Sequence, residues 1–169
     1  MAKADLTAAR VRELFDYDAD AGVLTHAQPA KNNAIKAGTA VGAVNSNGYL
    51  HTRIDSVSFK VHRLVWLHFY GTEPVGQIDH INGDRTDNRI ANLRDVGPSV
   101  NRQNIRRAPA GKRSGLPLGV ALSGRGPRPY RAQIRIAGRL TFLGEFATPE
   151  AAHTAYVEAK RSAHPGFTL

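Results

Sequence analysis

The sequence has no cysteine among its 169 residues. This absence excludes disulfide bonds and thiolate zinc sites, so any metal ion must be held by oxygen or imidazole ligands. Long apolar runs are also missing, since none approaches the roughly 18 residues of a membrane-spanning helix, and the first residues lack the apolar core of a signal peptide. We therefore expect a cytoplasmic protein that does not associate with a membrane.

Carboxylates are absent from one long segment. Between Arg102 and Arg139 there are ten Lys and Arg residues and no Asp or Glu. Residues 1–101 hold eleven basic and eleven acidic residues, whereas residues 102–169 hold twelve and three, so the second part carries the whole net charge of +9. A surface that only confers solubility usually mixes both signs. The one-sided charge therefore favours binding to a polyanion, and nucleic acid is the commonest one in a cytoplasm.

The composition, 41% hydrophobic and 22% charged, is that of a globular protein. Apolar spacing and breaker residues predict a series of elements in the first part of the chain. They are a helix over 6–16 with Thr7 as N-cap, hairpin strands within 22–60, a helix over 61–70 ended by Gly71, a strand over 77–80, and a helix over 99–106 after Pro98. The mixture of short strands and helices predicts an α+β protein.

The best linker in the sequence is residues 107–115, which are rich in Gly, Pro and basic side chains and lack apolar periodicity. We therefore expect one domain over 1–106, with a core at about 61–106, and a second over 116–169. In the second domain the pattern predicts three strands and a helix with Thr148 as N-cap and Pro149 at its first position. The strands are expected at 118–122, 130–136 and 140–142.

Asp79 and His80 stand at the head of a segment rich in carboxamides. Ile81-Asn82-Gly83 follows directly, and four further asparagines come after it: Asn88, Asn92, Asn101 and Asn104. A carboxylate beside an imidazole, with amide oxygens nearby, supplies hard metal ligands and a proton acceptor. The segment therefore favours a metal-assisted hydrolase over the alternative of a salt-bridged strand end.

This segment closely resembles the HNH nuclease motif. The flanking sequences also resemble that family's phage and intron-borne members; they are Leu14-Phe15-Asp16-Tyr17, Gly22-Val23-Leu24-Thr25, Asn47-Gly48-Tyr49-Leu50 and Val61-His62-Arg63-Leu64-Val65-Trp66. The resemblance implies a ββα-metal finger. In it His80 is the general base, Asp79 and Asn101 bind the metal, and Asn92 bridges backbone groups of the loop. Oxygen ligands of this kind suit Mg²⁺, with Mn²⁺ as a substitute.

Adjacent strand residues point to opposite faces, so Asp79 and His80 share one site only if the strand twists or bulges there. The resemblance implies that they do converge. It further implies a homing-type endonuclease that acts on double-stranded DNA. A single metal site favours a nick in one strand over a double-strand break unless two copies act together. We expect a monomer, which works in the host cytoplasm if a phage encodes it. No protein partner is expected.

Residues 116–169 resemble the Apetala-two type of DNA-binding domain, which lays a three-stranded sheet in the major groove. Arg135 and Phe142 fall where that family places groove-contacting side chains, whereas Ala121 and Leu140 replace its usual arginines. The remaining arginines are therefore expected to contact phosphate, which gives affinity but little sequence readout. They are Arg125, Arg128, Arg131 and Arg139.

Two alternatives remain open from the sequence. One is a DNA-binding regulator without catalytic activity that keeps the finger as a scaffold, and the other is a module that binds or cleaves RNA. Within the segment, Asn88 and Asn104 are interpreted as loop and helix-surface residues. His62 and His68 lie six residues apart, which does not place them on one helical face as a metal pair. Structural roles are therefore expected for both histidines.

Overall fold

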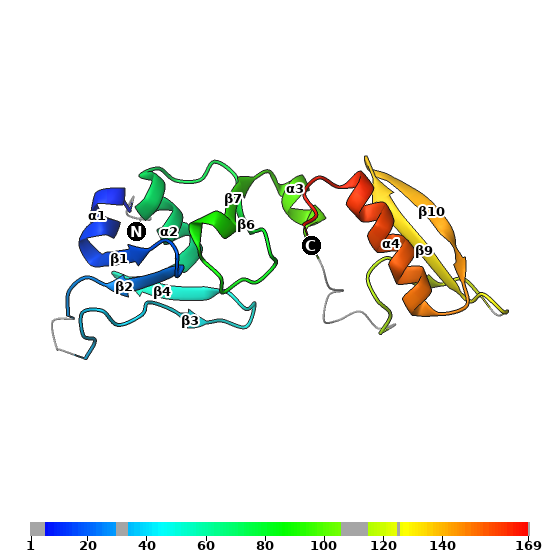
Figure 1. Ribbon diagram of the computed structural model, residues 1–169. Helices are drawn as coiled ribbons and strands as arrows, with labels where there is room; N and C mark the ends of the chain where they lie inside the picture. Colours follow the sequence, from blue (N-terminus) through cyan, green and yellow to red (C-terminus); the bar gives the residue numbers. More distant parts are fainter. Residues whose placement is uncertain (1–5, 30–33, 106–114, 125, 169) are drawn as a thin grey trace. The chain divides into compact units, whose positions relative to one another are not determined.

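The computed structural model describes residues 6–29, 34–105, 115–124 and 126–168 of the chain. Its contacts divide it into two compact units, Met1–Pro98 and Ser99–Leu169. The predicted linker at 107–115 lies outside the described residues apart from Gly115, and so does Arg125. Small antiparallel sheets and four helices make up the described parts, which confirms the predicted α+β class (Figure 1).

The first unit combines two helices with three small antiparallel sheets. Strand β1 pairs with β2, β3 pairs with β4 and β4 with β5, and β6 pairs with β7. The elements in chain order are α1 (Ala8–Leu14), β1 (Phe15–Asp18), β2 (Val23–His26), β3 (Ala43–Val44), β4 (Leu50–Ile54), β5 (Val57–Lys60), α2 (Val61–Tyr70), β6 (Gln77–His80), the 3₁₀ turn η1 (Ile90–Asn92) and β7 (Leu93–Val96).

The helix ends follow the local signals in the sequence. Thr7 caps α1, because its side chain accepts a hydrogen bond from the backbone N–H of Arg10 at 3.2 Å. Helix α2 ends at Gly71, whose φ of 77° is a left-handed conformation that glycine adopts without strain. Both predictions are therefore confirmed. The predicted extension of α1 to residue 16 is wrong, because Phe15 and Asp16 pair with β2 as a strand.

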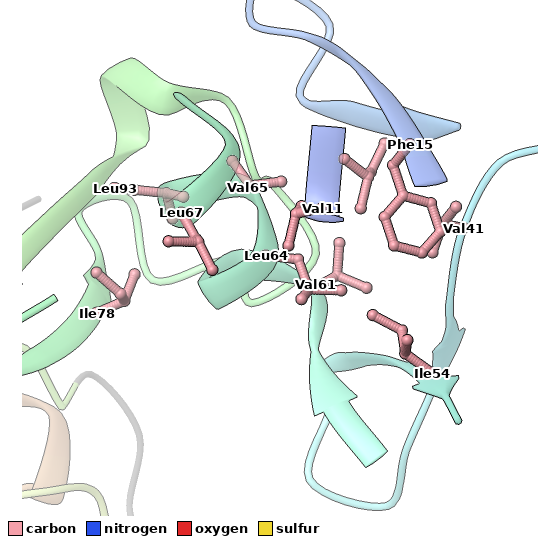
Figure 2. Close-up of a cluster of buried hydrophobic side chains, with 11 residues drawn as sticks. Val11, Phe15, Val41, Ile54, Val61, Leu64, Val65, Leu67, Ile78 and Leu93 are labelled. Carbon is pink, nitrogen blue, oxygen red and sulfur yellow. The ribbon is translucent and has the colours of Figure 1, made fainter. Parts of the chain in front are cut away.

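One hydrophobic core joins most elements of the first unit. Figure 2 shows ten of its eleven buried side chains with labels, and Leu24 is the remaining member (Figure 2). Val61, Leu64, Val65 and Leu67 of α2 supply its centre. Ile78 of β6 and Leu93 of β7 belong to the same cluster. The hairpin that carries Asp79 and His80 therefore rests on a core shared with the N-terminal strands.

The second unit contains the helix α3 and a sheet with another helix packed on it. Helix α3 spans Pro98–Gln103, so its first residue is the last residue of the first unit. The sheet has the order β10-β9-β8 and is antiparallel throughout. Its elements are β8 (Val120–Leu122), β9 (Tyr130–Ile136), β10 (Arg139–Phe146) and α4 (Pro149–Ala163). Val120, Ala132 and Ala152 form its buried cluster.

Several element bounds in the second unit differ from prediction. Helix α3 is shorter than the predicted 99–106, and β10 extends to Phe146 instead of ending at residue 142. A register shift between Phe142 and Gly144 lets β10 continue, because a bulge absorbs the extra residue without ending the pairing. The N-cap at Thr148 and the start at Pro149 agree with prediction.

Candidate active site

Asp79 and His80 are the last two residues of β6, which pairs with β7 in continuous register. Asp79 lies opposite Arg94 and His80 lies opposite Leu93, with no register shift between them. The pairing contains no bulge at this point, so convergence of the two side chains depends on the twist of the strand and stays a prediction.

The Asp79 carboxylate is held by Arg94. Its Oδ2 atom accepts hydrogen bonds from Arg94 Nε at 2.9 Å and from Arg94 Nη2 at 2.7 Å. The Asp79 side chain is only 7% exposed, and Arg94 is the charged hydrogen-bond partner that a carboxylate at that depth requires. Arg94 therefore orients Asp79 across the hairpin.

The His80 imidazole is buried and hydrogen-bonded. Its Nε2 atom lies 3.0 Å from Oδ1 of Asn88, and the two residues are 3% and 1% exposed. Asn88 lies in a loop, as interpreted from the sequence, but its side chain is buried against His80. Burial lowers the pKa of His80, and the hydrogen bond that His80 makes to the Asn88 amide oxygen opposes that change. The imidazole is thus neutral at neutral pH and able to accept a proton.

Two aromatic rings pack against His80. The ring centroid of His62, on α2, lies 5.2 Å away in an edge-on arrangement, and that of Tyr49 lies 5.9 Å away. Tyr49 also contacts His62 edge-on at 5.2 Å. Above Tyr49 lie two cations, Lys60 at 5.0 Å and Arg85 at 4.8 Å from the ring centroid. His80 is therefore confined by rings from two other segments of the chain.

Asn92 makes the bridging contacts with loop backbone groups that the sequence predicted. Its Oδ1 atom accepts from the backbone N–H of Asn82 at 2.9 Å, and its Nδ2 atom donates to the carbonyl of Asp87 at 2.7 Å. The backbone N–H of Ile81 bonds in turn to the carbonyl of Asn92 at 2.8 Å. These bonds close the loop between β6 and β7 at the residues next to His80.

Asn101, the second predicted metal ligand, lies on α3 and belongs to the second unit. Its pairing with Asp79 therefore stays a prediction. Within the part of the chain that the structure describes, no group of three or more His, Asp or Glu side chains is placed to hold a metal ion. The carboxylate and carboxamide oxygens predicted as ligands still fit a hard cation such as Mg²⁺ in chemical kind. Asn104, predicted on the helix surface, is instead buried.

In the second unit, Arg131 and Arg135 lie on the face of β9 that points away from α4. The opposite face carries Ala132 and Ile134, which lie between the two arginines in the strand and are buried. Cross-strand pairing puts Phe142 beside Gln133, and Ala121 and Leu140 beside these arginines. Phe142 is 60% exposed. Arg139 instead pairs with Ile136, which belongs to the same alternate residues of β9 as Ala132 and Ile134. Arg128 is exposed and precedes the start of β9.

The side chains that contact Asp79 and His80 were not predicted from the sequence. Arg94 could have been found from the spacing of a hairpin once β7 was recognised, because it lies directly opposite Asp79. Asn88 and His62 carry no such signal, since their contacts to His80 arise from a loop and a helix that meet only in three dimensions. His68 has a structural contact, as expected: its Nε2 atom lies 3.1 Å from the carbonyl of Phe15.

Burial of His62 should make the first unit sensitive to acid. Desolvation lowers the pKa of His62 from 6.5 to about 3, and the neighbouring His80 acts in the same direction. The unfolded chain therefore binds more protons between these pH values, so the free energy of unfolding falls as pH drops from 6.5 toward 3. The loss is on the order of 5 kcal/mol at the acid end.

Denaturant unfolding of the full chain at several pH values between 7 and 4 measures this effect. The variant His62→Phe keeps an aromatic ring beside Tyr49 but cannot be protonated, so its stability should depend less steeply on pH. Equal slopes for the two proteins would contradict the assignment of acid sensitivity to His62.

Among the described helices, none is both long enough and apolar enough to cross a membrane.

Comparison with known proteins finds one segment that is similar to a family. Residues 59–106 match the family described as HNH endonuclease, and this segment contains α2, β6 and β7 together with Asp79, His80, Asn92 and Asn101. The match covers less than a third of the chain. The similarity to the HNH endonuclease family thus lies in the segment that carries the candidate site.

No curated protein matches the chain. One similar solved structure is described as "DNA binding and cleavage by the HNH homing endonuclease I-HmuI". The two are 26% identical, the similarity covers 53% of this chain and 50% of that one, and the TM-score is 0.39. The chain therefore spans about half the length of that protein.

Proposed function

We propose that the protein is a metal-dependent DNA endonuclease of the HNH homing type. One observation carries the proposal: the segment that matches the HNH endonuclease family ends its strand β6 with a buried imidazole, His80, next to a carboxylate, Asp79. A neutral imidazole held in place is a general base. A carboxylate at the same strand end is a ligand for a cation on the phosphate.

His80 performs the proton transfer in this proposal. Its Nε2 atom already faces Asn88, so it accepts the proton of the attacking water at Nδ1. The resulting hydroxide attacks the phosphorus and the bond from phosphorus to the 3′ oxygen breaks. The departing 3′ oxyanion takes a proton from solvent water, so the products carry a 5′ phosphate and a 3′ hydroxyl. A positioned general base contributes roughly 10²- to 10⁴-fold to such a reaction.

Asp79 and Asn101 are the residues that hold the divalent cation, which is Mg²⁺ or its substitute Mn²⁺. When bound, the cation stabilises the negative charge that develops on the phosphate oxygens. Arg94 keeps the Asp79 carboxylate oriented across the hairpin. Asn92 holds the loop that follows His80 in its closed form. A site with one cation cuts one strand per engagement, so the product is a nick.

Asp79→Ala and Asn101→Ala should each raise the Mg²⁺ concentration needed for half-maximal cleavage, by roughly tenfold or more, because each removes an oxygen ligand from a sparsely ligated cation. Titration of Mg²⁺ in a cleavage assay measures the shift. Asn92→Ala is the control: it removes two loop hydrogen bonds and should lower stability, leaving the position of the Mg²⁺ curve unchanged. A curve for Asn101→Ala that superimposes on that of the unmodified protein removes Asn101 from the metal site.

The second unit is proposed as the DNA anchor, in the manner of an Apetala-two sheet. The face of its sheet opposite α4 presents Arg131 and Arg135 with the exposed ring of Phe142. Arginine with an exposed aromatic ring suits a nucleic-acid surface. Ala121 and Leu140 reduce base readout on that face, so binding through phosphate contacts dominates.

Incubation with supercoiled DNA tests the proposal. We expect the full chain to convert supercoiled plasmid to the nicked form in Mg²⁺, and to lose that activity with a chelator. Binding without conversion in Mg²⁺ or Mn²⁺ would instead support the alternative of a DNA-binding regulator that keeps the finger as a scaffold. Duplex RNA of the same sequence, tested in parallel, discriminates the RNA alternative.

A further inference from the structure

The side chain of Asn88 is placed to control which nitrogen of His80 carries the proton. Its Oδ1 atom lies 3.0 Å from His80 Nε2, and both side chains are buried. An amide oxygen can only accept a hydrogen bond, so Nε2 must be the protonated nitrogen and Nδ1 carries the lone pair. In a neutral imidazole one hydrogen bond of this kind selects the tautomer.

A purely space-filling role does not account for Asn88. Among the residues that the structure describes, its Nδ2 atom has no hydrogen-bond partner although it is buried. An unpaired buried donor costs free energy that an apolar side chain of similar size avoids. The carboxamide is thus used at this position for its acceptor oxygen, and that oxygen meets His80.

The backbone of Asn88 is held by the hairpin of β1 and β2. The Tyr17 hydroxyl, on β1, donates to the carbonyl of Asn88 at 2.8 Å. Burial raises the pKa of Tyr17 to about 12, so the hydroxyl keeps its proton and remains a donor. This bond joins residues 71 positions apart in the sequence, and Tyr17 lies outside the segment that matches the nuclease family.

Gly22, in the turn between β1 and β2, makes the second contact between this hairpin and the loop that contains Asn88. Its φ is +71°, and a Cβ atom built there would lie 2.4 Å from the backbone nitrogen of Arg89 and 2.8 Å from the carbonyl carbon of Asn88. These distances are far below van der Waals contact, so only glycine allows the backbone of the turn to pack this closely against the backbone of the loop. The hairpin therefore fixes the loop backbone at the residue that faces His80.

We propose that Asn88 is the positioning residue for His80, selecting its Nε2-protonated tautomer, and that the β1–β2 hairpin holds Asn88 in place through Tyr17 and Gly22. The importance of this tautomer for catalysis rests on the proposed function, in which Nδ1 accepts the proton from water. The tautomer itself does not depend on that function. The hairpin thereby acts as a support for the site from outside the nuclease segment.

The first experiment reads the tautomer directly. Full-length protein with ¹⁵N-labelled histidine, free of metal and DNA, is examined by NMR at neutral pH, and the His80 signals are assigned by their absence from His80→Ala. We expect the ¹⁵N shifts of a protonated Nε2 atom. Asn88→Leu, which removes the acceptor at similar volume, should give a mixture of tautomers. Asn88→Asp, which keeps an acceptor oxygen, should retain the original one.

The second experiment measures cleavage of supercoiled DNA by the same variants. Asn88→Leu should lower kcat by about 10- to 100-fold, as found for residues that orient a reacting group, with KM for DNA unchanged within about twofold. Asn88→Asp should recover most of that loss. Tyr17→Phe, which removes one hydrogen bond to the Asn88 backbone, should lower kcat about fivefold.

The outcomes separate the two proposals. A protonated Nδ1 atom in the unmodified protein, or an unchanged tautomer in folded Asn88→Leu, overturns the role of Asn88. That role stands, and the nuclease function fails, if the tautomer changes as expected while the unmodified protein does not cleave DNA. Should Asn88→Leu fail to fold, the unmodified protein and Asn88→Asp decide the tautomer. Tyr17→Phe with unchanged kcat and unchanged NMR signals of His80 overturns the part assigned to the hairpin.

Discussion

His80→Ala is expected to lower the rate of DNA cleavage by about 10²- to 10⁴-fold, because it removes the general base from the proposed reaction. DNA affinity should stay nearly intact, since residues 102–169 carry the whole net positive charge and the charges of residues 1–101 sum to zero. Single-turnover cleavage of supercoiled DNA gives the rate, and a binding assay in the absence of divalent cation gives the affinity.

His26→Ala is a matched control, because it deletes an imidazole of the same unit that packs on Phe15. Its cleavage rate should remain within about twofold of the unmodified protein. Cleavage by His80→Ala at close to the unmodified rate would remove His80 from the mechanism. A folded His80→Ala protein with equally weakened binding would instead assign His80 to the DNA contact.

The triple variant Arg128→Gln, Arg131→Gln and Arg139→Gln should weaken DNA binding without regard to sequence. Each phosphate contact contributes about 0.9 to the slope of log affinity against log salt, so the slope should fall by about 2.7. The unmodified protein should therefore lose about 40-fold more affinity than the variant between 50 and 200 mM salt. Binding titrations at four salt concentrations measure both slopes.

The control removes the same charge from the first unit through Arg10→Gln, Lys36→Gln and Arg53→Gln. Arg10 is already paired with Glu13, and all three side chains are exposed. The control should change the slope far less than the triple variant in the second unit. Equal slopes in the two variants would mean that binding follows net charge alone, and the second unit would not be the DNA anchor.

Local patterns in the sequence were enough to place most elements. Helix α2 is 61–70 as predicted, because an apolar run begins there and Gly71 ends it in a left-handed conformation. Strand β9 is also as predicted, and α4 starts at Thr148 and Pro149 because capping depends on neighbours along the chain. The Asp79-His80 pair likewise lies at the end of a strand.

Other features depended on contacts between distant segments. Phe15 and Asp16 continue an apolar helical pattern, yet they form a strand because β2 offers backbone partners that no local pattern reveals. Strand β7 had no clear signal in the sequence, so the ion pair between Arg94 on that strand and Asp79 could not be predicted. In these cases pairing between strands outweighed local preference.

The candidate site shows the same division. Residue type and the resemblance to the HNH motif predicted His80 as the proton acceptor, because an imidazole is suited to that chemistry wherever it lies. Its burial and its neighbours Asn88, His62 and Tyr49 come from the meeting of a loop, a helix and a hairpin, and so does the tautomer that we propose for it. Desolvation and hydrogen-bond direction depend on distances in space, which spacing along the chain does not record. The kind of chemistry could therefore be predicted from the residues, whereas the burial and the hydrogen bond of the His80 imidazole were decided by tertiary packing.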